Sequence, residues 1–317
     1  MRPIENFEYP PDLQKDFEKA KKLEWITVFY LLSAIVVMYL TMGNSQAMKT
    51  AWFEDLLSLT PSVSFLISAR IFSRKPNEEF PYGYHRVVSI AYLCSSLALF
   101  AVGGFLLLDS GMTIVEQDRP TIGMITLFGH SFWLGYLMIG ALIYGSVPAV
   151  FLGRMKLPLA ERLHEKNLYT DAEMNKADWM TGLAAIVGII GIGFGLWWAD
   201  SAAAALISLD ILHDGYKNLK QAVVDLMNQE PKTVNNQETD PLIKLVREHL
   251  SRKTWIRDVQ VRLREEGHIY MGEAFVVPAE DLNLTQHIEE AAQEIKNINW
   301  RLHEVVITPV KELPEPD

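Results

Sequence analysis

Four side chains that could bind a cation lie close together at the start of a long apolar stretch. Asp171, Asn175 and Asp178 fall on one helix face at about 100° per residue, and Met174 lies beside them. Two carboxylates, an amide and a thioether make an oxygen-rich ligand set with one soft member, which suits a divalent metal ion. The same residues could instead form the polar, solvated beginning of a helix, so the rest of the chain has to decide.

A second acidic group lies in an earlier apolar stretch. Glu54 and Ser58 are four residues apart and therefore share a helix face, and Asp55 follows Glu54 directly. Ionisable residues within a membrane span cost roughly 2.5 to 3.5 kcal/mol each to insert, which makes them candidates for function. Two helices that each bring a carboxylate and a weaker ligand can enclose one divalent cation. The predicted metal ligands are Glu54, Asp55, Ser58, Asp171, Met174, Asn175 and Asp178.

Six apolar stretches could carry these residues through a membrane. The predicted spans are Trp25–Met42, Trp52–Ala69, Val87–Leu108, Ile122–Leu152, Asp178–Trp198 and Ala199–Ile211, the last continuing as an amphipathic helix to Met227. A charged linker is expected at 153–176, and Lys156 is counted among its loop charges. Basic residues gather before the first span, between the second and third, and between the fourth and fifth. By the positive-inside rule, both termini are cytoplasmic and the protein lies in the inner or plasma membrane.

The domain plan follows from this pattern. We predict a cytoplasmic N-terminal segment at 1–24, a six-helix transmembrane domain at 25–227, a linker at 228–240 and a cytoplasmic domain at 241–317. Helical and alternating patterns in the last of these give the order helix–strand–strand–helix–strand, which is typical of a small α+β, ferredoxin-like domain. The fold class is therefore an α-helical membrane protein with a C-terminal α+β domain.

Composition and motifs exclude several functions. The net charge of −10 argues against a nucleic-acid partner, and the single cysteine excludes an intrachain disulfide. The spans contain no His-Glu-x-x-His motif and no nucleophile–base pair, so we expect no enzyme. The histidines after the second span and in the C-terminal domain are expected to be surface residues; these are His85, His249, His268, His287 and His303.

The order of six spans, an acidic second span, an acidic fifth span and a C-terminal α+β domain resembles the cation diffusion facilitator family over nearly the whole chain. Glu54 and Ser58 stand at the family's paired acidic positions in the second span. Met174 and Asp178 stand where the family usually has a histidine or aspartate followed, four positions on, by an aspartate. The resemblance implies a homodimer in the lipid bilayer that exports divalent cations from the cytoplasm in exchange for protons, by alternating access and without a prosthetic group.

Two of these four positions depart from the family pattern. The changes remove an imidazole and one carboxylate, for which Asp55, Asp171 and Asn175 could substitute. A thioether is a poor ligand for Mg²⁺ or Ca²⁺, so transition metals are favoured, and manganese, iron, zinc and cadmium all remain open. The altered ligand set also leaves one alternative, a non-transporting membrane scaffold or metal sensor of the same fold. An intramembrane metalloenzyme is a third hypothesis, and the absence of catalytic motifs from the spans argues against it.

Overall fold

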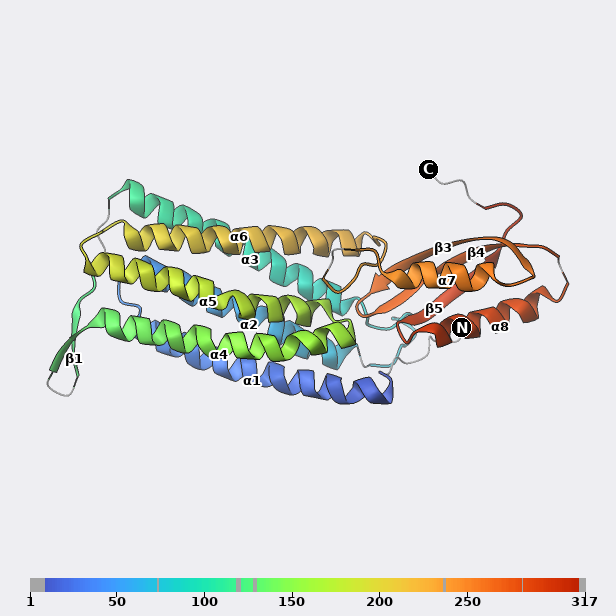
Figure 1. Cartoon of the computed structure of the whole chain (residues 1–317), viewed down its shortest axis with the longest axis horizontal. Coiled ribbons are helices and arrows are strands. Elements are labelled where there is room, and N and C mark those ends of the chain that lie inside the picture. The colour runs from blue at the N-terminus through green and yellow to red at the C-terminus, as the bar shows by residue number, and fades with distance from the viewer. Residues whose placement is uncertain are drawn as a thin grey trace.

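The computed structural model has a long helical bundle at one end and a small sheet domain at the other (Figure 1). It describes residues 9–72, 74–117, 121–127, 130–235, 238–280 and 282–313. The bundle helices are α1 (Pro11–Thr41), α2 (Gln46–Ile71), α3 (Val87–Val115), α4 (Leu134–Leu163), α5 (Lys166–Gly193) and α6 (Ala199–Leu226). The shortest has 26 residues, which at 1.5 Å per residue is about 39 Å of helix.

Four of these helices, α1, α3, α4 and α5, are long and apolar enough to cross a membrane by length and composition. The other two, α2 and α6, run alongside them in the bundle (Figure 1). Both carry acids along their length, among them Glu54 and Asp55 on α2 and Asp200 and Asp210 on α6. Helices that bring polar groups into a bundle are less apolar than helices that only contact lipid.

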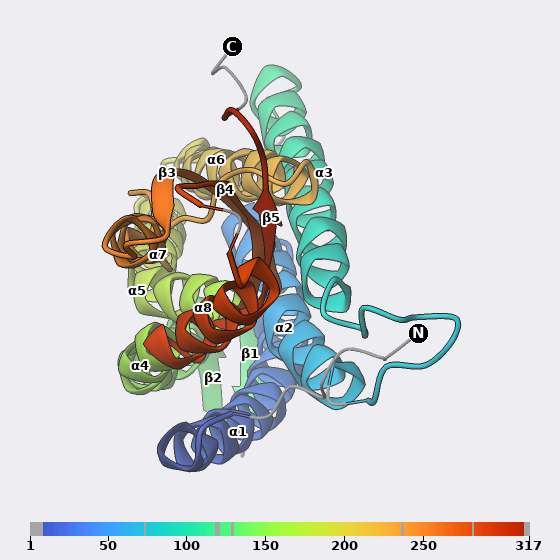
Figure 2. The ribbon, with the colours of Figure 1, turned by 90° about the vertical axis from the view of Figure 1, so that its right-hand side faces the viewer.

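The second helix has the most neighbours in the bundle. It contacts α1, α3, α5 and α6, while α3 packs along α6 and α4 along α5 (Figure 2). Close packing of α3 and α6 depends on glycine, because a Cβ on Gly215 would lie 2.6 Å from the backbone nitrogen of Phe100. The central position of α2 allows its side chains to meet those of several other helices.

Two predicted boundaries in the middle of the chain are wrong. The expected fourth span at Ile122–Leu152 begins instead with an antiparallel hairpin of β1 (Met124–Leu127) and β2 (His130–Trp133). The expected charged linker at 153–176 is almost entirely helical, with only His164 and Glu165 between α4 and α5. The charges misled the prediction because Lys156 and Asp171 pair with each other inside the protein rather than facing water. The fifth helix therefore begins at Lys166 and not at Asp178.

The C-terminal domain has the predicted order of elements. It consists of α7 (Pro241–Ser251), β3 (Ile256–Glu266), β4 (Ile269–Pro278), α8 (Leu284–Ile298) and β5 (Leu302–Pro309). The sheet order is β3-β4-β5, with β3 antiparallel and β5 parallel to β4. Apolar residues of both helices pack on one face of this sheet, among them Val246 and Ile295.

A second apolar cluster joins the sheet domain to the bundle. Phe17 of α1 and Phe65 of α2 pack there with Ile269 and Met271 of β4. Because alternate residues of a strand face opposite sides, β4 packs on its own helices with one side and on the bundle with the other.

The prediction of surface histidines is wrong for two of them at this junction. His85 is 3% exposed and His268 is fully buried, and their rings lie 6.1 Å apart. The ring of His303 lies 5.8 Å from that of His85. Burial and the two neighbouring histidines lower the pKa of His85 to about 3, so it stays neutral at physiological pH. Sequence alone gives no sign of this burial, because it arises only where the two domains meet.

Candidate metal-ion site

The start of α2 is fixed by a carboxylate from another helix. Asp200 of α6 is fully buried and accepts hydrogen bonds from the Ser45 hydroxyl (2.7 Å) and the Gln46 amide (2.5 Å). Ser45 in turn caps α2 by accepting from the amide of Met48 (3.1 Å). This arrangement ties the end of α2 to α6 and so helps to set where Glu54, two turns further along, points.

The structure brings the acids of the second and fifth helices together. Glu54 is half-buried and interacts electrostatically with Asp178, Asp55 and, from α6, Asp210; it also contacts Thr181 of α5. Asp178 is only 7% exposed and interacts electrostatically with Asp55 as well. We call Glu54, Asp55 and Asp178 the acid cluster. Like charges gathered in a poorly hydrated site repel one another unless a proton or another cation neutralises them.

Several oxygens of α2 and α5, in or near the acid cluster along the chain, are buried and lack a hydrogen-bond partner among the described residues. They are Oδ2 of Asp55, Oδ2 of Asp178 and Oδ1 of Asn175. Oδ2 of Asp55 also lies 3.5 Å from the point where Gly145 would carry a Cβ, so the missing side chain on α4 leaves room beside it. Burying a polar atom without a partner is costly, and three acceptors without donors fit a cation ligand set.

Tyr30 of α1 borders the acid cluster, although sequence analysis gave no sign of it. Its hydroxyl donates to the carbonyl oxygens of Tyr144 (2.7 Å) and Gly145 on α4. It interacts electrostatically with Asp55 and Asp178. Because both hydrogen bonds of this side chain go to α4, Tyr30 holds α1 and α4 together next to the acids.

Asp171, another predicted ligand, is already bound to other groups. The ammonium of Lys156 on α4 pairs with Asp171 and, at 3.0 Å, with Glu24 of α1. The other partners of Asp171 are the hydroxyl of Ser62 at 3.3 Å and the amide nitrogen of Asn175 at 3.2 Å. Asp171 therefore belongs to an ion-paired group, which we call the lysine triad: Glu24, Lys156 and Asp171.

Lys156 is the residue that sequence reasoning missed most clearly. The side chain is fully buried, as is that of Glu24, whereas the sequence placed Lys156 in a solvated loop. The available signal was its neighbourhood, since Met155 and Leu157–Ala160 around it are uncharged and mostly apolar. The signal is weak, because Arg154 stands two positions before Lys156 and Glu161 and Arg162 follow the apolar residues.

Met174 and Ser58 lie differently from the acids. Met174 packs against the apolar core of the bundle and lines a small cavity toward α3 and α6 with Tyr92 and Asn218. Ser58 is 3% exposed, one turn beyond Glu54 on α2. Within the described ranges, no group of three or more Asp, Glu, His or Cys side chains is arranged so that it could hold a metal ion. Any cation at the acid cluster would thus also use amide or hydroxyl oxygens.

Comparison with known proteins decides the family. A sequence model of the cation efflux transmembrane domain matches residues 25–227. The chain belongs to the cation efflux family. This confirms the resemblance to cation diffusion facilitators and the expectation of a metal-cation transporter rather than an enzyme, and it makes the protein a membrane protein.

Three relatives show how far the similarity of this cation efflux protein extends, and two of them are named as manganese efflux proteins. It is 25% identical over 273 residues to the manganese efflux system protein MneS of Bacillus subtilis, covering 86% of this chain and 87% of that protein. It is 22% identical over 276 residues to the manganese efflux system protein MneP of the same organism, covering 84% and 86%. The magnetosome protein MamM of Magnetospirillum gryphiswaldense is 24% identical over 200 residues, covering 61% and 58%.

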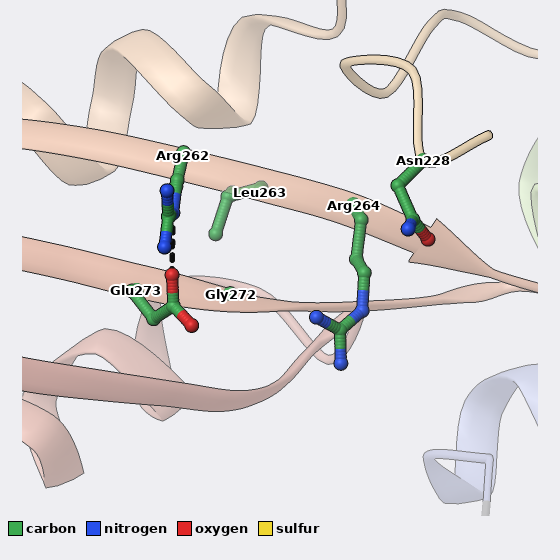
Figure 3. Close-up of a pocket in the computed structure, with 6 residues that line it drawn as sticks. All are labelled: Asn228, Arg262, Leu263, Arg264, Gly272 and Glu273. Carbon is green, nitrogen blue, oxygen red and sulfur yellow. Dashed lines mark hydrogen bonds and ion pairs between the residues drawn. The ribbon is translucent and has the colours of Figure 1, made fainter.

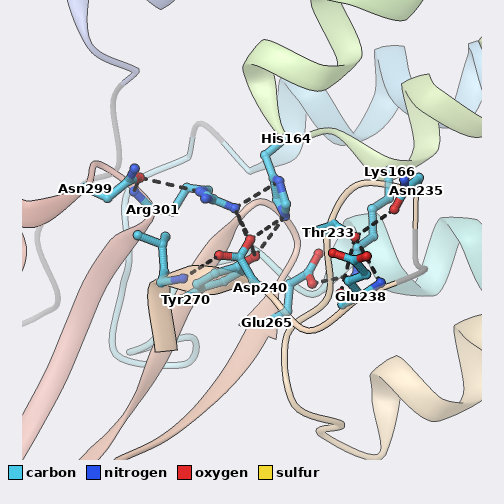
Figure 4. Close-up of polar contacts among 11 residues, drawn as sticks. His164, Lys166, Thr233, Asn235, Glu238, Asp240, Glu265, Tyr270, Asn299 and Arg301 are labelled. Carbon is cyan, nitrogen blue, oxygen red and sulfur yellow. Dashed lines mark hydrogen bonds and ion pairs between the residues drawn. The ribbon is translucent and has the colours of Figure 1, made fainter. Parts of the chain in front are cut away.

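The cation efflux protein has a second polar network, where its bundle meets the sheet domain (Figure 4). Asp240 accepts from the Tyr270 hydroxyl (2.8 Å) and from Arg301 (2.5 Å). His164, at the corner between α4 and α5, accepts from Arg301 through Nδ1 (3.0 Å), while its Nε2 lies 2.8 Å from the Tyr270 oxygen. Beside them Lys166 pairs with Glu265 at 2.6 Å. These contacts attach the corner that precedes α5 to the sheet.

Burial governs the charges in this network. Desolvation, with Arg301 and Lys166 nearby, lowers the pKa of His164 to about 2. A neutral ring is also what the hydrogen bonds require, because Nδ1 accepts from a guanidinium. Desolvation raises the pKa of Glu265 to about 7, although Lys166 opposes the shift. The network is therefore sensitive to protons near neutral pH.

A third polar region lies on the sheet of the cation efflux protein, away from the bundle acids. A hollow of about 290 Å³ is lined by Asn228, Arg262, Leu263, Arg264, Gly272 and Glu273 (Figure 3). Arg262 and Glu273 face each other on paired strands and form an ion pair across the hollow. Two arginines and one paired carboxylate do not make a cation site, so this region is no rival to the acid cluster.

Proposed function

We propose that this protein exports divalent metal cations from the cytoplasm, with Glu54, Asp55 and Asp178 as its charged ligands. Asn175 supplies a neutral oxygen, and Ser58 lies one turn from Glu54 on the same helix. The observation that carries the proposal is the set of buried, unpartnered oxygens on Asp55, Asn175 and Asp178. A doubly charged ion would neutralise the acids and satisfy those oxygens at once.

Manganese is the substrate that this arrangement favours. Met174 packs in the apolar core, so the groups left around Asp178 are carboxylate and amide oxygens. Oxygen ligands suit Mn²⁺ better than the softer metals, which prefer sulfur or imidazole. Two of the relatives covering most of this chain are named as manganese efflux proteins, which supports the same choice. Iron(II), zinc and cadmium are the competitors to be tested.

Exchange for protons follows from the chemistry of the ligands. Carboxylates hold either protons or a metal ion, so metal binding releases protons and each species displaces the other. Alternating access of such a site to the two sides couples the two movements in opposite directions. The proposal includes six membrane spans, cytoplasmic termini in the plasma membrane, a ferredoxin-like C-terminal domain and a homodimer; the basic loops and the family resemblance support these features.

The test is Mn²⁺ uptake into inverted membrane vesicles with an acidic interior. The Asp178→Asn and Glu54→Gln variants should lower the initial uptake rate by roughly tenfold or more, because each removes a charged ligand. Asp109→Asn is the matched control, since Asp109 is also an acid of the bundle but is paired with Lys49 at 2.9 Å, away from the acid cluster. It should transport at close to the wild-type rate.

Two results would contradict the proposal in different ways. Wild-type uptake by both ligand variants would show that the acid cluster is not the site. No metal-dependent uptake or proton movement by the wild type, with Mn²⁺, Fe²⁺, Zn²⁺ or Cd²⁺, would instead favour a non-transporting scaffold or sensor with this fold.

A further inference from the structure

The lysine triad is a cation site whose cation is part of the protein. The ammonium of Lys156 lies between carboxylates of α1 and α5, and all three side chains are at most 2% exposed. Oε1 of Glu24 is buried and has no hydrogen-bond partner among the described residues. A fully buried lysine is costly unless its charge is matched, so such complete burial points to a role for the charge.

One amide side chain lies between the triad and the acid cluster on α5. Asp171 and Asp178 are seven residues apart on α5, or about 10 Å along the helix, and Asn175 lies between them. The amide nitrogen of Asn175 donates to Asp171, while its amide oxygen, like Oδ2 of Asp178, has no partner among the described residues. Asp178 also interacts electrostatically with both Asp171 and Lys156. The charge state of the triad therefore acts on Asp178 through space, and Asn175, which is bound to Asp171, lies between the two groups on α5.

We propose that Lys156 is a specificity-determining residue: it neutralises Asp171 and thereby limits the negative charge that the transported cation meets. It acts through Asp171 and Asn175 and does not itself contact the ion, so it is a positioning residue. Without the ammonium, Asp171 adds an uncompensated charge next to the acid cluster, and a divalent ion binds more tightly and leaves more slowly. This inference rests on the proposed function, because it concerns the same cation site.

Removing Lys156 alone would leave two unpaired acids and could prevent folding, so the test uses two double variants. Glu24→Gln with Lys156→Met leaves Asp171 as the unpaired acid, whereas Lys156→Met with Asp171→Asn leaves Glu24. Both pairs remove one positive and one negative charge, so their net charge equals that of the wild type. They differ only in which carboxylate remains, and the amide oxygen that Asp171→Asn introduces can still accept from Asn175.

The measurement is the Kd for Mn²⁺ of the purified, folded full-length protein in detergent, by titration calorimetry, alongside vesicle uptake. The variant that keeps Asp171 should bind Mn²⁺ roughly tenfold more tightly than the wild type and release it more slowly, so that its maximal uptake rate falls. The variant that keeps Glu24 should have a Kd close to that of the wild type. Lys156→Arg, which keeps the charge, should also resemble the wild type.

The possible outcomes separate this inference from the proposed function. Equal Mn²⁺ affinities in the two double variants would show that Lys156 has only a structural role, even if both were less stable. If the wild type binds and transports Mn²⁺ but the two double variants bind it with equal affinity, the inference is overturned and the proposed function stands. A wild type that binds no divalent cation would overturn both.

Discussion

Two groups of acids lie about two helical turns apart on α5 and differ in what neutralises them. In the lysine triad, Asp171 and Glu24 share the ammonium of Lys156. In the acid cluster, Asp178 interacts electrostatically with several acids and with Lys156, but no ion pair joins it to a basic side chain in the part of the chain that the structure describes. A covalently attached cation makes the first group a permanent link between α1, α4 and α5. The second group has no such built-in cation, and under the proposed function a metal ion or protons from solution neutralise it and can be exchanged.

The largest effect is expected from removing the built-in cation. Lys156→Met should destabilise the protein by about 3–5 kcal/mol in the absence of divalent ions, because breaking a buried ion pair leaves uncompensated charges in a dry environment. Denaturant unfolding of the detergent-solubilised protein measures this change. A loss similar to that of an exposed lysine, within about 0.5 kcal/mol, would show that Lys156 is solvated and that the two acid groups do not differ in this way.

The matched control removes the charges of the whole triad. Glu24→Gln, Lys156→Met and Asp171→Asn together should recover most of the lost stability, because neutral side chains of similar size need no counter-charge. Failure to recover would mean that the shape of Lys156, rather than its charge, holds the three helices together.

A dissolved cation should stabilise the acid cluster, as the ammonium of Lys156 stabilises the carboxylates of Glu24 and Asp171. Mn²⁺ at about one hundred times its Kd should stabilise the wild type by about 2.7 kcal/mol, since an ion that binds only the folded state shifts the folding equilibrium. Asp178→Asn should remove about half of this gain or more, because tenfold weaker binding leaves about 1.4 kcal/mol at the same Mn²⁺ concentration. The ion-free variant should be no less stable than the ion-free wild type, because the substitution removes one of several like charges.

Thermal unfolding with and without Mn²⁺ tests this expectation, with Mg²⁺ at the same concentration as a check on ionic strength. Equal stabilisation of the wild type and Asp178→Asn would place the ion elsewhere. Destabilisation of the ion-free protein by Asp178→Asn would mean that this carboxylate already has a cationic partner, and the contrast between the two groups would disappear.

Sequence patterns predicted the helical order, the α+β domain and the meeting of Glu54 with Asp178. Acids within apolar helices are costly to bury, so those that occur there are candidates for function. Their spacing along the helix then shows which of them lie on the same face. That these residues bind a metal ion stays a prediction. Periodicity also grouped Asp171 and Met174 with Asp178, but a helix has several neighbours: Asp171 pairs with Lys156, and Met174 packs against the apolar core.

What the sequence could not predict depends on partners far apart in the chain. In the sequence, Lys156 is typical of a loop charge. Its burial depends on ion pairs with Asp171 and with Glu24, which lies 132 residues earlier, and only the fold brings these side chains together. His268 is a turn residue between two strands until the bundle covers it. The β1–β2 hairpin was assigned to a span because short alternating strands and apolar helix segments look alike in average hydropathy.

The smallest predicted effect is the pH dependence of stability that arises at the junction before α5. It has to be distinguished from the pH dependence of metal binding. The pKa of His164 falls from 6.5 to about 2 on folding, so the unfolded chain binds a proton below pH 6.5 that the folded protein does not. The stability that the neutral, buried His164 contributes is therefore fully present above pH 6.5. It is lost as the pH falls below 6.5, because protonation then favours the unfolded chain. Between pH 7 and 5.5 the loss is about 1 kcal/mol.

His164→Gln should remove this part of the acid sensitivity, and comparison of its pH–stability profile with that of the wild type isolates it. The difference between variants is needed because Glu265, whose pKa rises to about 7, acts with the opposite sign: the folded protein takes up a proton there as the pH falls through 7, which adds stability. His85, with a pKa lowered to about 3, acts in the same direction as His164 and stays in both proteins. Parallel profiles for the two proteins would show that His164 is solvated at the junction. If the Mn²⁺ affinity of His164→Gln kept its full dependence on pH, that dependence would belong to the acid cluster alone.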